Sequence, residues 1–299
     1  MLTRLRSLLF TPGNRLDRVP KALAAGADAV ILDLEDAVGA ADKLASRTAV
    51  TAFFAAAEPG QRASAMIGVR VNSLQSELGR ADLAALATLP AAQRPDFLVF
   101  PKAETVAEPA LCRRAFGADT AATTAATAAA TTAANTASGI GMPALIAIIE
   151  SARGVLAAPA LAAAPGVQAL AVGGLDLCAD LGCSFGWEPL LHARSAVVMA
   201  AASAGICAVD MPWFDLQDDS GLVAECQRVR ALGYGAKLAI HPRHVAGVNA
   251  AFSPSAEERD YAEGVIAAFE AAAGNAFTFR GRMIDEPVIR SARRVLARA

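Results

Sequence analysis

The chain has 299 residues, of which 55% are hydrophobic and 19% are charged, and its formal net charge is −2. This length and composition allow one large α/β domain, or two smaller ones, with a sizeable core. The near-neutral charge gives no basic field for a nucleic acid or an anionic membrane, so we expect neither as a partner.

The N-terminus, MLTRLRSLLFTPG, lacks the long apolar region and the cleavage site of a signal peptide. No run of about 20 apolar residues with membrane-like flanks follows it. The five cysteines are an odd number and form no CxxC pair, which is typical of buried, reduced thiols. These features predict a cytoplasmic protein.

Short apolar runs alternate with helix-length segments along the chain. The runs expected to be strands are 7–11, 29–34, 66–71, 97–100, 144–149, 167–172, 207–211 and 236–240. Segments rich in Ala, Leu and Arg, such as 16–25 and 221–232, lie between them. Eight alternating β/α units in about 240 residues predict an α/β fold, the TIM (β/α)8 barrel. The alternative, a doubly wound open sheet, requires a Gly-rich phosphate loop after the first strand, and TPGNR is not GxGxxG.

Two segments fall outside a minimal barrel. Residues 117–139 are a low-complexity Ala/Thr stretch between the fourth helix and the fifth strand, which we interpret as an insertion on the bottom face. The tail, GNAFTFRGRMIDEPVIRSARRVLARA, is rich in specific side chains and is expected to dock. We therefore divide the chain into a barrel of residues 1–273 and a C-terminal extension of residues 274–299.

Catalytic groups of TIM barrels lie at the C-terminal ends of the strands. The polar residues at or just after the C-terminal ends of the predicted strands are Asp33, Glu35, Asp36, Arg70, Asn72, Lys102, Glu150, Asp176 and His241. Glu150 and Asp176 are one β/α unit apart, which places their carboxylates on neighbouring strands at one level. Mg²⁺ typically takes one or two protein carboxylates together with waters and substrate oxygens. Arg70 offers the planar fork that grips a substrate carboxylate.

Several of these residues have a structural interpretation beside the functional one. Glu35 and Asp36 either orient neighbouring groups and metal-bound waters or cap the next helix. Lys102 is interpreted first as the partner of a neighbouring acid, and His241 as a structural residue at a strand end.

Eight motifs carry a family resemblance when they are taken together and in order. They are RSLLFTPGNR, AGADAVILDLEDAV, VRVN, FPKAET, IIESARGV, GGLDLCADLG, KLAIHP and GRMIDEPVIRSARRVL. The chain resembles the citrate lyase beta subunit / malyl-CoA lyase superfamily over nearly its whole length. This resemblance implies a TIM barrel that uses Mg²⁺, or Mn²⁺ in its place, to cleave or form a C–C bond beside a thioester.

The resemblance also implies roles for particular residues. It makes Glu150 and Asp176 the metal ligands and Arg70 the residue that binds the 2-oxo acid. In the CoA-thioester lyases, the Asp of a C-terminal MID motif reaches into a neighbouring subunit's site as the acid/base, and here that residue is Asp285. The C-terminal extension is then expected to pack on a neighbouring subunit, in a homotrimer or homohexamer.

Further expectations concern the pocket. Basic residues after the first strand often meet the phosphates of CoA in this family, so the resemblance makes Arg15, Arg18 and Lys21 candidates for that contact. Glu35 and Asp36 are counted with the catalytic group. Related pyruvate-class aldolases carry a His at the position of Asp36, which argues against that branch. Leu175 fills a place that is often polar beside the metal-binding Asp, so we expect a drier pocket.

The expected reaction is Mg²⁺-dependent cleavage or formation of a 3-hydroxy-3-carboxyacyl-CoA, such as malyl-CoA or citramalyl-CoA, with acetyl-CoA and a 2-oxo acid as products. One alternative is a citrate lyase beta subunit that acts on a thioester of an acyl carrier protein. Others are a CoA-independent 2-oxo-acid aldolase, thioester hydrolysis coupled to condensation, and a non-catalytic binding barrel. The choice among malyl, methylmalyl, citramalyl and citryl substrates depends on small differences in the pocket.

Overall fold

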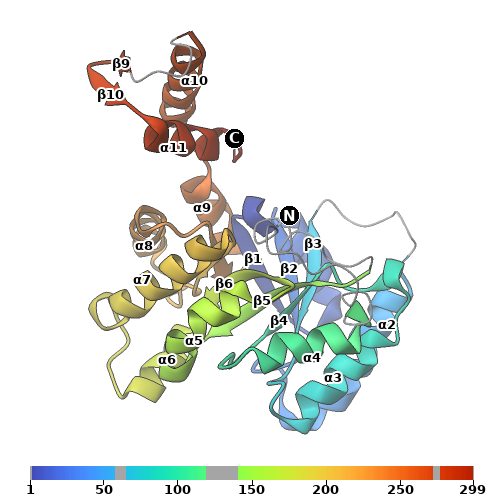
Figure 1. The fold of residues 1–299 in the computed structure, drawn as a ribbon. Coiled ribbons are helices and arrows are strands. Elements are labelled where there is room, and N and C mark those ends of the chain that lie inside the picture. The colour runs from blue at the N-terminus through green and yellow to red at the C-terminus, as the bar shows by residue number, and fades with distance from the viewer. Residues whose placement is uncertain (1, 58–64, 119–140, 272–276, 299) are drawn as a thin grey trace.

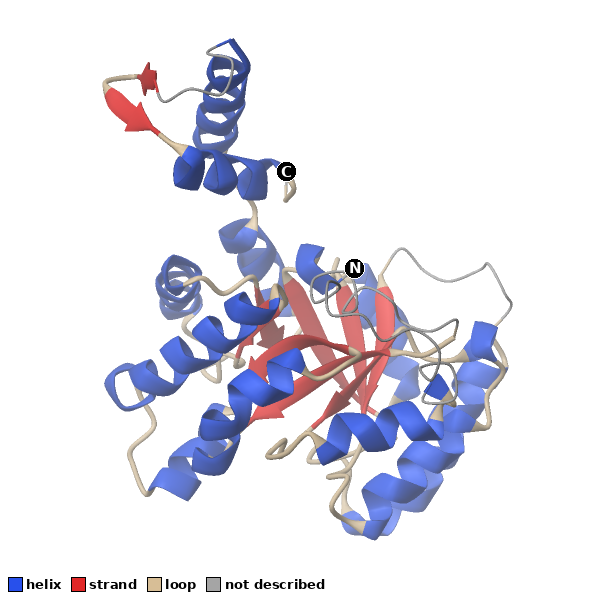
Figure 2. Ribbon diagram, in the orientation of Figure 1, coloured by secondary structure: helices blue, strands red, loops and turns tan. Residues whose placement is uncertain are grey.

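The computed structural model describes residues 2–57, 65–118, 141–271 and 277–298. Its centre is a closed barrel of eight parallel strands in sequential order, completed by pairing of the first strand with the eighth. The strands are β1 (Ser7–Pro12), β2 (Ala29–Asp33), β3 (Met66–Arg70), β4 (Phe97–Phe100), β5 (Ala144–Ile149), β6 (Val167–Val172), β7 (Cys207–Asp210) and β8 (Ala236–Ala239). Helices surround the barrel (Figures 1 and 2). The predicted TIM barrel is confirmed, and each strand begins and ends within one residue of its predicted bounds.

Helices follow each strand of the barrel. They are α1 (Val19–Ala24), α2 (Lys43–Ala55), α3 (Glu77–Ala87), α4 (Ala107–Ala115), α5 (Ala152–Ala163), α6 (Gly174–Leu181), α7 (Trp187–Ala204), α8 (Asp219–Leu232) and α9 (Arg243–Phe252). Several begin at a capping side chain, since Ser76 accepts the N–H of Gly79, Ser151 that of Gly154, and Asp218 that of Gly221. None of the helices that the structure describes is both long and apolar enough to cross a membrane.

Two apolar clusters hold the barrel together. The inner cluster fills the barrel with alternate strand residues such as Leu8, Ile31 and Phe97, and the outer one lies between the strands and the helices. Gly68 faces the interior, where a Cβ would lie 2.3 Å from the Phe97 ring, so this ring occupies the space that a side chain on β3 would need. Four cysteines are buried and Cys183 is half-buried, all as free thiols.

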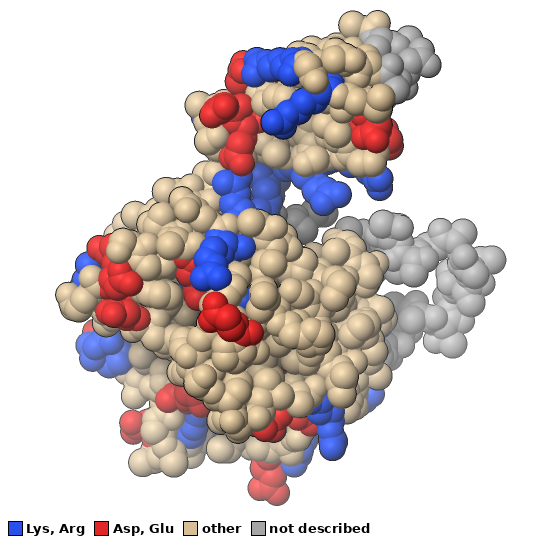
Figure 3. Space-filling view, turned by 90° about the vertical axis from the view of Figure 1, so that its left-hand side faces the viewer, with Lys and Arg blue, Asp and Glu red and all other residues tan. Residues whose placement is uncertain are grey.

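The C-terminal part forms a unit of its own beside the barrel (Figure 1). It consists of α10 (Ala256–Ala271), the hairpin of β9 (Phe277–Phe279) and β10 (Arg282–Ile284), and α11 (Glu286–Leu296). A small apolar cluster, which includes Val265, Ile284 and Ile289, joins α10 to the hairpin and to α11. Helix α10 precedes the boundary that we placed after residue 273, yet it packs with the extension. Lys and Arg side chains gather at the base of this unit, beside the barrel (Figure 3).

The unit touches the end of the barrel where the strands begin. Arg298 lies against Gly235, just before β8, and beside Cys207, the first residue of β7. The described part of the predicted Ala/Thr insertion is limited to residues 117–118, and its remainder, 119–139, lies outside the described residues.

Candidate active site

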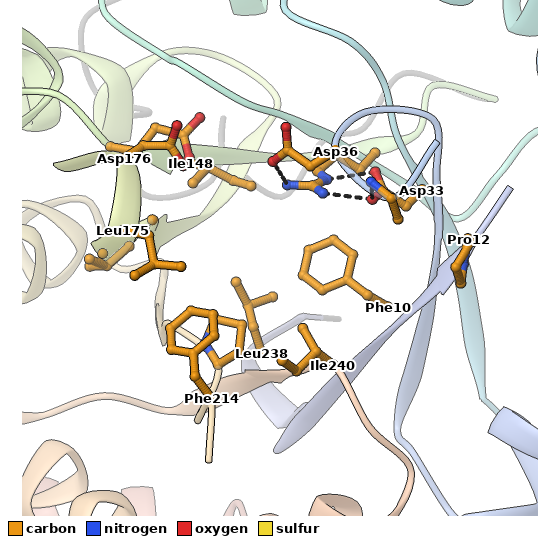
Figure 4. A pocket seen from close by; sticks show the side chains of 17 residues that line it. Phe10, Pro12, Asp33, Asp36, Ile148, Leu175, Asp176, Phe214, Leu238 and Ile240 are labelled. Atoms are coloured by element: carbon orange, nitrogen blue, oxygen red, sulfur yellow. Dashed lines mark hydrogen bonds and ion pairs between the residues drawn. The ribbon is translucent and has the colours of Figure 1, made fainter. Parts of the chain in front are cut away.

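A pocket of about 390 Å³ opens at the end of the barrel where the strands finish. Its lining comes from the ends of β1, β2, β3, β5, β6 and β8 and from segments that follow β2, β5, β6, β7 and β8. Figure 4 shows acids and a guanidinium along one side and apolar side chains along the other. The pocket therefore has a charged wall and an apolar wall, at the end of the barrel where TIM-barrel enzymes bind their substrates.

Arg70 is the centre of the charged wall. Its Nε and Nη2 donate to the two oxygens of Asp33 at 2.7 and 2.6 Å, in the side-by-side geometry that suits a guanidinium and a carboxylate. Its Nη1 lies 2.9 Å from Glu35 Oε2 and 3.4 Å from Asp36 Oδ2. The guanidinium also lies over the ring of Phe10, 4.7 Å from the centroid. Three carboxyl groups and a ring thus fix one orientation of Arg70.

The acids of β2 and its following loop owe their position to local hydrogen bonds. Asp33 is paired with Arg70 in the β2–β3 register and accepts the N–H groups of Glu35 and Ala37 at 2.9 and 3.0 Å. Lys43 Nζ donates to the carbonyls of Leu34 and Glu35. The buried run of β2 ends in acids because these carboxyls bind Arg70 and because Asp33 holds the following loop.

Glu150 and Asp176 both line the pocket, and the Asp176 carboxyl is close enough to act on the charge of Glu150. Glu150 is buried at the end of β5, whereas Asp176 is exposed in the first turn of α6. Glu150 Oε1 accepts the backbone N–H of Lys102 at 2.7 Å. Gly173 makes room for this carboxylate, because a Cβ there would lie 2.3 Å from Glu150 Oε2.

Burial raises the pKa of Glu150 to about 8, and the neighbouring Glu35 and Asp176 carboxyls add to this shift. Burial also raises the pKa of Glu35 to about 7, against the opposing effect of Arg70 and Lys102. Burial is the main cause of both shifts, and like charge adds to them, since the five acids Asp33, Glu35, Asp36, Glu150 and Asp176 meet two cations, Arg70 and Lys102.

The donor set fits a hard divalent cation. Two carboxylates that converge in a partly open pocket leave room for waters and substrate oxygens, as Mg²⁺ prefers. Among the described residues, no group of three or more His, Cys, Asp or Glu forms a closed metal cage. Glu150 and Asp176 are therefore the pair that could hold such an ion, with substrate and water completing its coordination.

Lys102 has an unusual backbone, with φ at +53°, a left-handed conformation that is rare for residues other than glycine. This conformation aims its N–H at Glu150, and its Nζ lies 3.5 Å from Glu35 Oε1. Burial lowers the pKa of the Lys102 amine, but the acids around it, first Glu35 and Glu150, outweigh burial and raise it. The predicted pairing with a neighbouring acid is confirmed.

Other predicted residues lie away from the pocket lining. Arg15, Arg18 and Lys21 are exposed after β1, and Arg15 forms an ion pair with Asp17 at 2.9 Å. Asp285 is exposed at the start of α11, in the C-terminal unit beyond α9 (Figure 1). The roles assigned to these four residues stay predictions.

Two of the polar strand-end residues have structural partners. Asn72 donates to Asp82 through both its backbone and its side chain, and His241 Nδ1 accepts the N–H of Arg243. Neither residue lines the pocket.

The sequence reasoning missed most of the apolar wall. Its lining includes Phe10, Phe214, Leu238 and Ile240, together with Leu175, which was expected to make the pocket drier. Alternation along the first strand was the available signal for Phe10, because residues 8, 10 and 12 share one face. Phe214 lies in the segment after β7, where no periodic pattern applies.

The fold and pocket define a TIM-barrel protein with a charged cavity at the C-terminal ends of its strands. Residues 6–242 match the family model described as HpcH/HpaI aldolase/citrate lyase, and the chain belongs to this family.

Similar proteins extend over nearly the whole chain. The chain is 33% identical to a (3S)-malyl-CoA thioesterase of Cereibacter sphaeroides, over 98% of this chain and 94% of that protein. It is 31% identical to the mitochondrial citramalyl-CoA lyase of Homo sapiens, over 98% of this chain and 85% of that protein. A solved structure of protein CitE from Mycobacterium tuberculosis, in complex with magnesium, acetoacetate and coenzyme A, is 31% identical. The match covers 100% of this chain and 99% of the CitE chain, with a TM-score of 0.76.

Proposed function

We propose that this protein is a Mg²⁺-dependent carbon–carbon lyase that acts on a 3-hydroxyacyl-CoA whose hydroxyl carbon also carries a carboxylate. The observation that carries the proposal is the Glu150–Asp176 pair beside Arg70, in a pocket with more acids than cations. Family membership and the lyase and magnesium complex among the similar proteins support it.

The reaction is a retro-aldol cleavage. The hydroxyl proton leaves, the bond between the hydroxyl carbon and the α-carbon of the thioester breaks, and its electron pair forms the enolate of acetyl-CoA. Protonation of that enolate gives acetyl-CoA, and the other fragment leaves as a 2-oxo acid. In the opposite direction the same groups form the bond.

Glu150 and Asp176 would hold the ion, and Gly173 leaves the space that the Glu150 carboxylate needs. When bound, Mg²⁺ supplies Lewis-acid stabilisation of oxygen charge worth several kcal/mol. Arg70 presents its remaining N–H donors to the carboxylate of the oxo acid, and Asp33 and Glu35 fix its orientation. Asp285 of a second copy would carry the proton, which in general acid–base catalysis contributes typically 10²–10⁴-fold.

The test is a product assay with malyl-CoA, citramalyl-CoA and citryl-CoA, each with Mg²⁺ and with EDTA. Glyoxylate, pyruvate, oxaloacetate and free thiol are measured separately. We expect Mg²⁺-dependent release of a 2-oxo acid, and its loss in Asp176→Asn but not in Asp42→Asn, an exposed acid outside the pocket. Unchanged activity of folded Asp176→Asn would refute the metal assignment.

The assay also separates the alternatives. Release of thiol without an oxo acid would indicate hydrolysis, the activity in the name of one relative. Turnover of a carrier-protein thioester but of no CoA ester would favour the citrate lyase beta subunit. Cleavage of a free hydroxy acid would favour the CoA-independent aldolase.

A further inference from the structure

The two walls of the pocket carry information about the substrate beyond the reaction type. A substrate of the proposed reaction has three groups on its hydroxyl carbon besides the hydroxyl: a carboxylate, the thioester arm and one variable substituent. The carboxylate belongs on the charged wall with Glu150, Asp176 and Arg70, and the thioester arm must leave through the opening. The variable substituent is left to face the opposite wall.

That opposite wall is hydrocarbon. Phe10, Leu238, Ile240 and Phe214 line it, and Leu175 extends it beside Asp176 (Figure 4). Leu175, Ile240 and Phe214 remain 50%, 42% and 36% exposed, although the Phe214 ring also packs edge-on against Phe185, so these lining residues keep apolar surface open to solvent. An alkyl group placed there removes this surface from water, at a gain of about fourfold in affinity for each methylene.

Positive charge for a second carboxylate is missing from the lining. Arg70 is the only cationic residue among the described residues that line the pocket, and Asp33, Glu35 and Asp36 already surround it. Lys102 lies outside the lining, with its amine beside Glu35.

The charge balance points the same way. Five carboxyl groups meet two cations at this mouth, so acids outnumber basic groups there. The single substrate carboxylate adds to this excess but lies against the metal and Arg70. A second one would face hydrocarbon with no counterion.

From the two walls we infer that the pocket selects substrates whose hydroxyl carbon bears an alkyl group and rejects those that bear a second carboxylate. The products are then acetyl-CoA and a 2-oxo acid with a hydrocarbon side chain. This inference rests on the proposed function and narrows its substrate class.

The experiment compares two 2-oxo acids of equal carbon number that differ in the end group, 2-oxobutyrate and oxaloacetate. Their binding to the protein with Mg²⁺ is measured by calorimetry, which requires no turnover. We expect 2-oxobutyrate to bind about a hundredfold more tightly, the discrimination that an apolar pocket shows against an added polar group. We call the ratio of the two affinities, 2-oxobutyrate over oxaloacetate, the binding gap. A binding gap of tenfold or more supports the inference, and a smaller one overturns it.

A substitution tests the wall itself. Ile240→Arg adds a cation at an exposed lining position and is expected to narrow the gap at least tenfold, through a charge-assisted bond to the second carboxylate. Leu156→Arg, at an 85% exposed position on α5 outside the pocket, makes the same change elsewhere and should leave the gap unaltered. An unaltered gap in folded Ile240→Arg would overturn the inference.

Turnover separates this inference from the proposed function. The wild type should cleave citramalyl-CoA at least tenfold faster than citryl-CoA at equal concentration. If neither thioester is cleaved while the binding gap is present, the proposed function fails and the selectivity stands. If both are cleaved equally, the selectivity fails and the lyase activity stands.

Discussion

The Gly173→Ala substitution probes the position of the Glu150 carboxylate with a single methyl group. A Cβ at residue 173 would lie 2.3 Å from Glu150 Oε2, 2.6 Å from Glu150 Cβ and 3.0 Å from the Ile148 side chain. The backbone at Gly173 has φ −105°, so alanine introduces no left-handed strain. The effect of the substitution is therefore steric.

The carboxylate cannot avoid the new methyl group by a change of rotamer alone, because Glu150 Cβ is fixed to β5. Relief of the contact needs a movement of about 1 Å, and a misplacement of that size in a site can cost about 10²-fold in rate. Overpacking also costs about 1–3 kcal/mol of folding stability. We expect kcat/KM for the Mg²⁺-dependent reaction to fall about a hundredfold, together with a higher Mg²⁺ concentration for half-activation.

Steady-state kinetics over a Mg²⁺ series and urea unfolding measure the two effects separately. Gly39→Ala is the matched control, since no atom lies within 4 Å of a Cβ there and its φ is −63°. A Gly173→Ala enzyme with kcat/KM within threefold of the parent and an unchanged Mg²⁺ requirement would show that Glu150 is not the residue that holds the ion.

Three other predictions concern charge. Lys237 is fully buried between two carboxylates, so Lys237→Met should cost about 3–5 kcal/mol in urea unfolding at pH 7, whereas Lys21→Met at an exposed position should cost little. Mg²⁺ at a hundredfold its Kd should stabilise the parent by about 2.7 kcal/mol in thermal unfolding and leave Asp176→Asn unaffected; equal stabilisation of both would contradict the site. Burial alone would raise the pKa of Asp28, but the hydrogen bonds and charge of Arg6 outweigh it, so the pKa lies below its ordinary 3.8. The stability that this pair contributes is therefore present above pH 3.8 and is lost as the pH falls through the pKa of the folded state. Asp28→Asn should then be less stable at pH 7 by about 1–3 kcal/mol, with a difference that shrinks in acid.

The barrel was predictable because its signal is local. Buried parallel strands read as short apolar runs, and their order along the chain is also their order around the barrel. The same geometry brought Arg70, Glu150 and Asp176 to one mouth, since strand ends converge. The sequence does not show which side chains pair with which inside the pocket.

Three features show why these contacts could not be predicted from the sequence. Asp33, Glu35 and Asp36 look alike in sequence, but only Asp33 faces both donors of the Arg70 fork, which depends on the β2–β3 register. Lys102 contributes a backbone N–H to Glu150, and nothing in its side chain signals a left-handed φ. Packing of α10 with the extension follows from apolar contacts across about 20 residues of chain, which periodicity within one helix does not encode.

The position of Asp285 leads to the last prediction. The C-terminal unit touches the barrel where the strands begin, through Arg298 beside Gly235 and Cys207. The pocket lies at the opposite ends of the strands and does not include Asp285. An acid/base role for Asp285 therefore requires a second copy of the chain, whose tail meets this pocket in a head-to-tail contact.

Mixing two inactive proteins distinguishes action across subunits from action within one. Asp285→Ala keeps an intact pocket, and Asp176→Asn keeps an intact tail. If tails act on neighbours, a denatured and refolded equimolar mixture contains pockets served by an intact tail, and activity should return to about one quarter of the parent value for random assembly. If each tail serves its own pocket, no subunit in the mixture is complete and activity stays at the level of the separate variants.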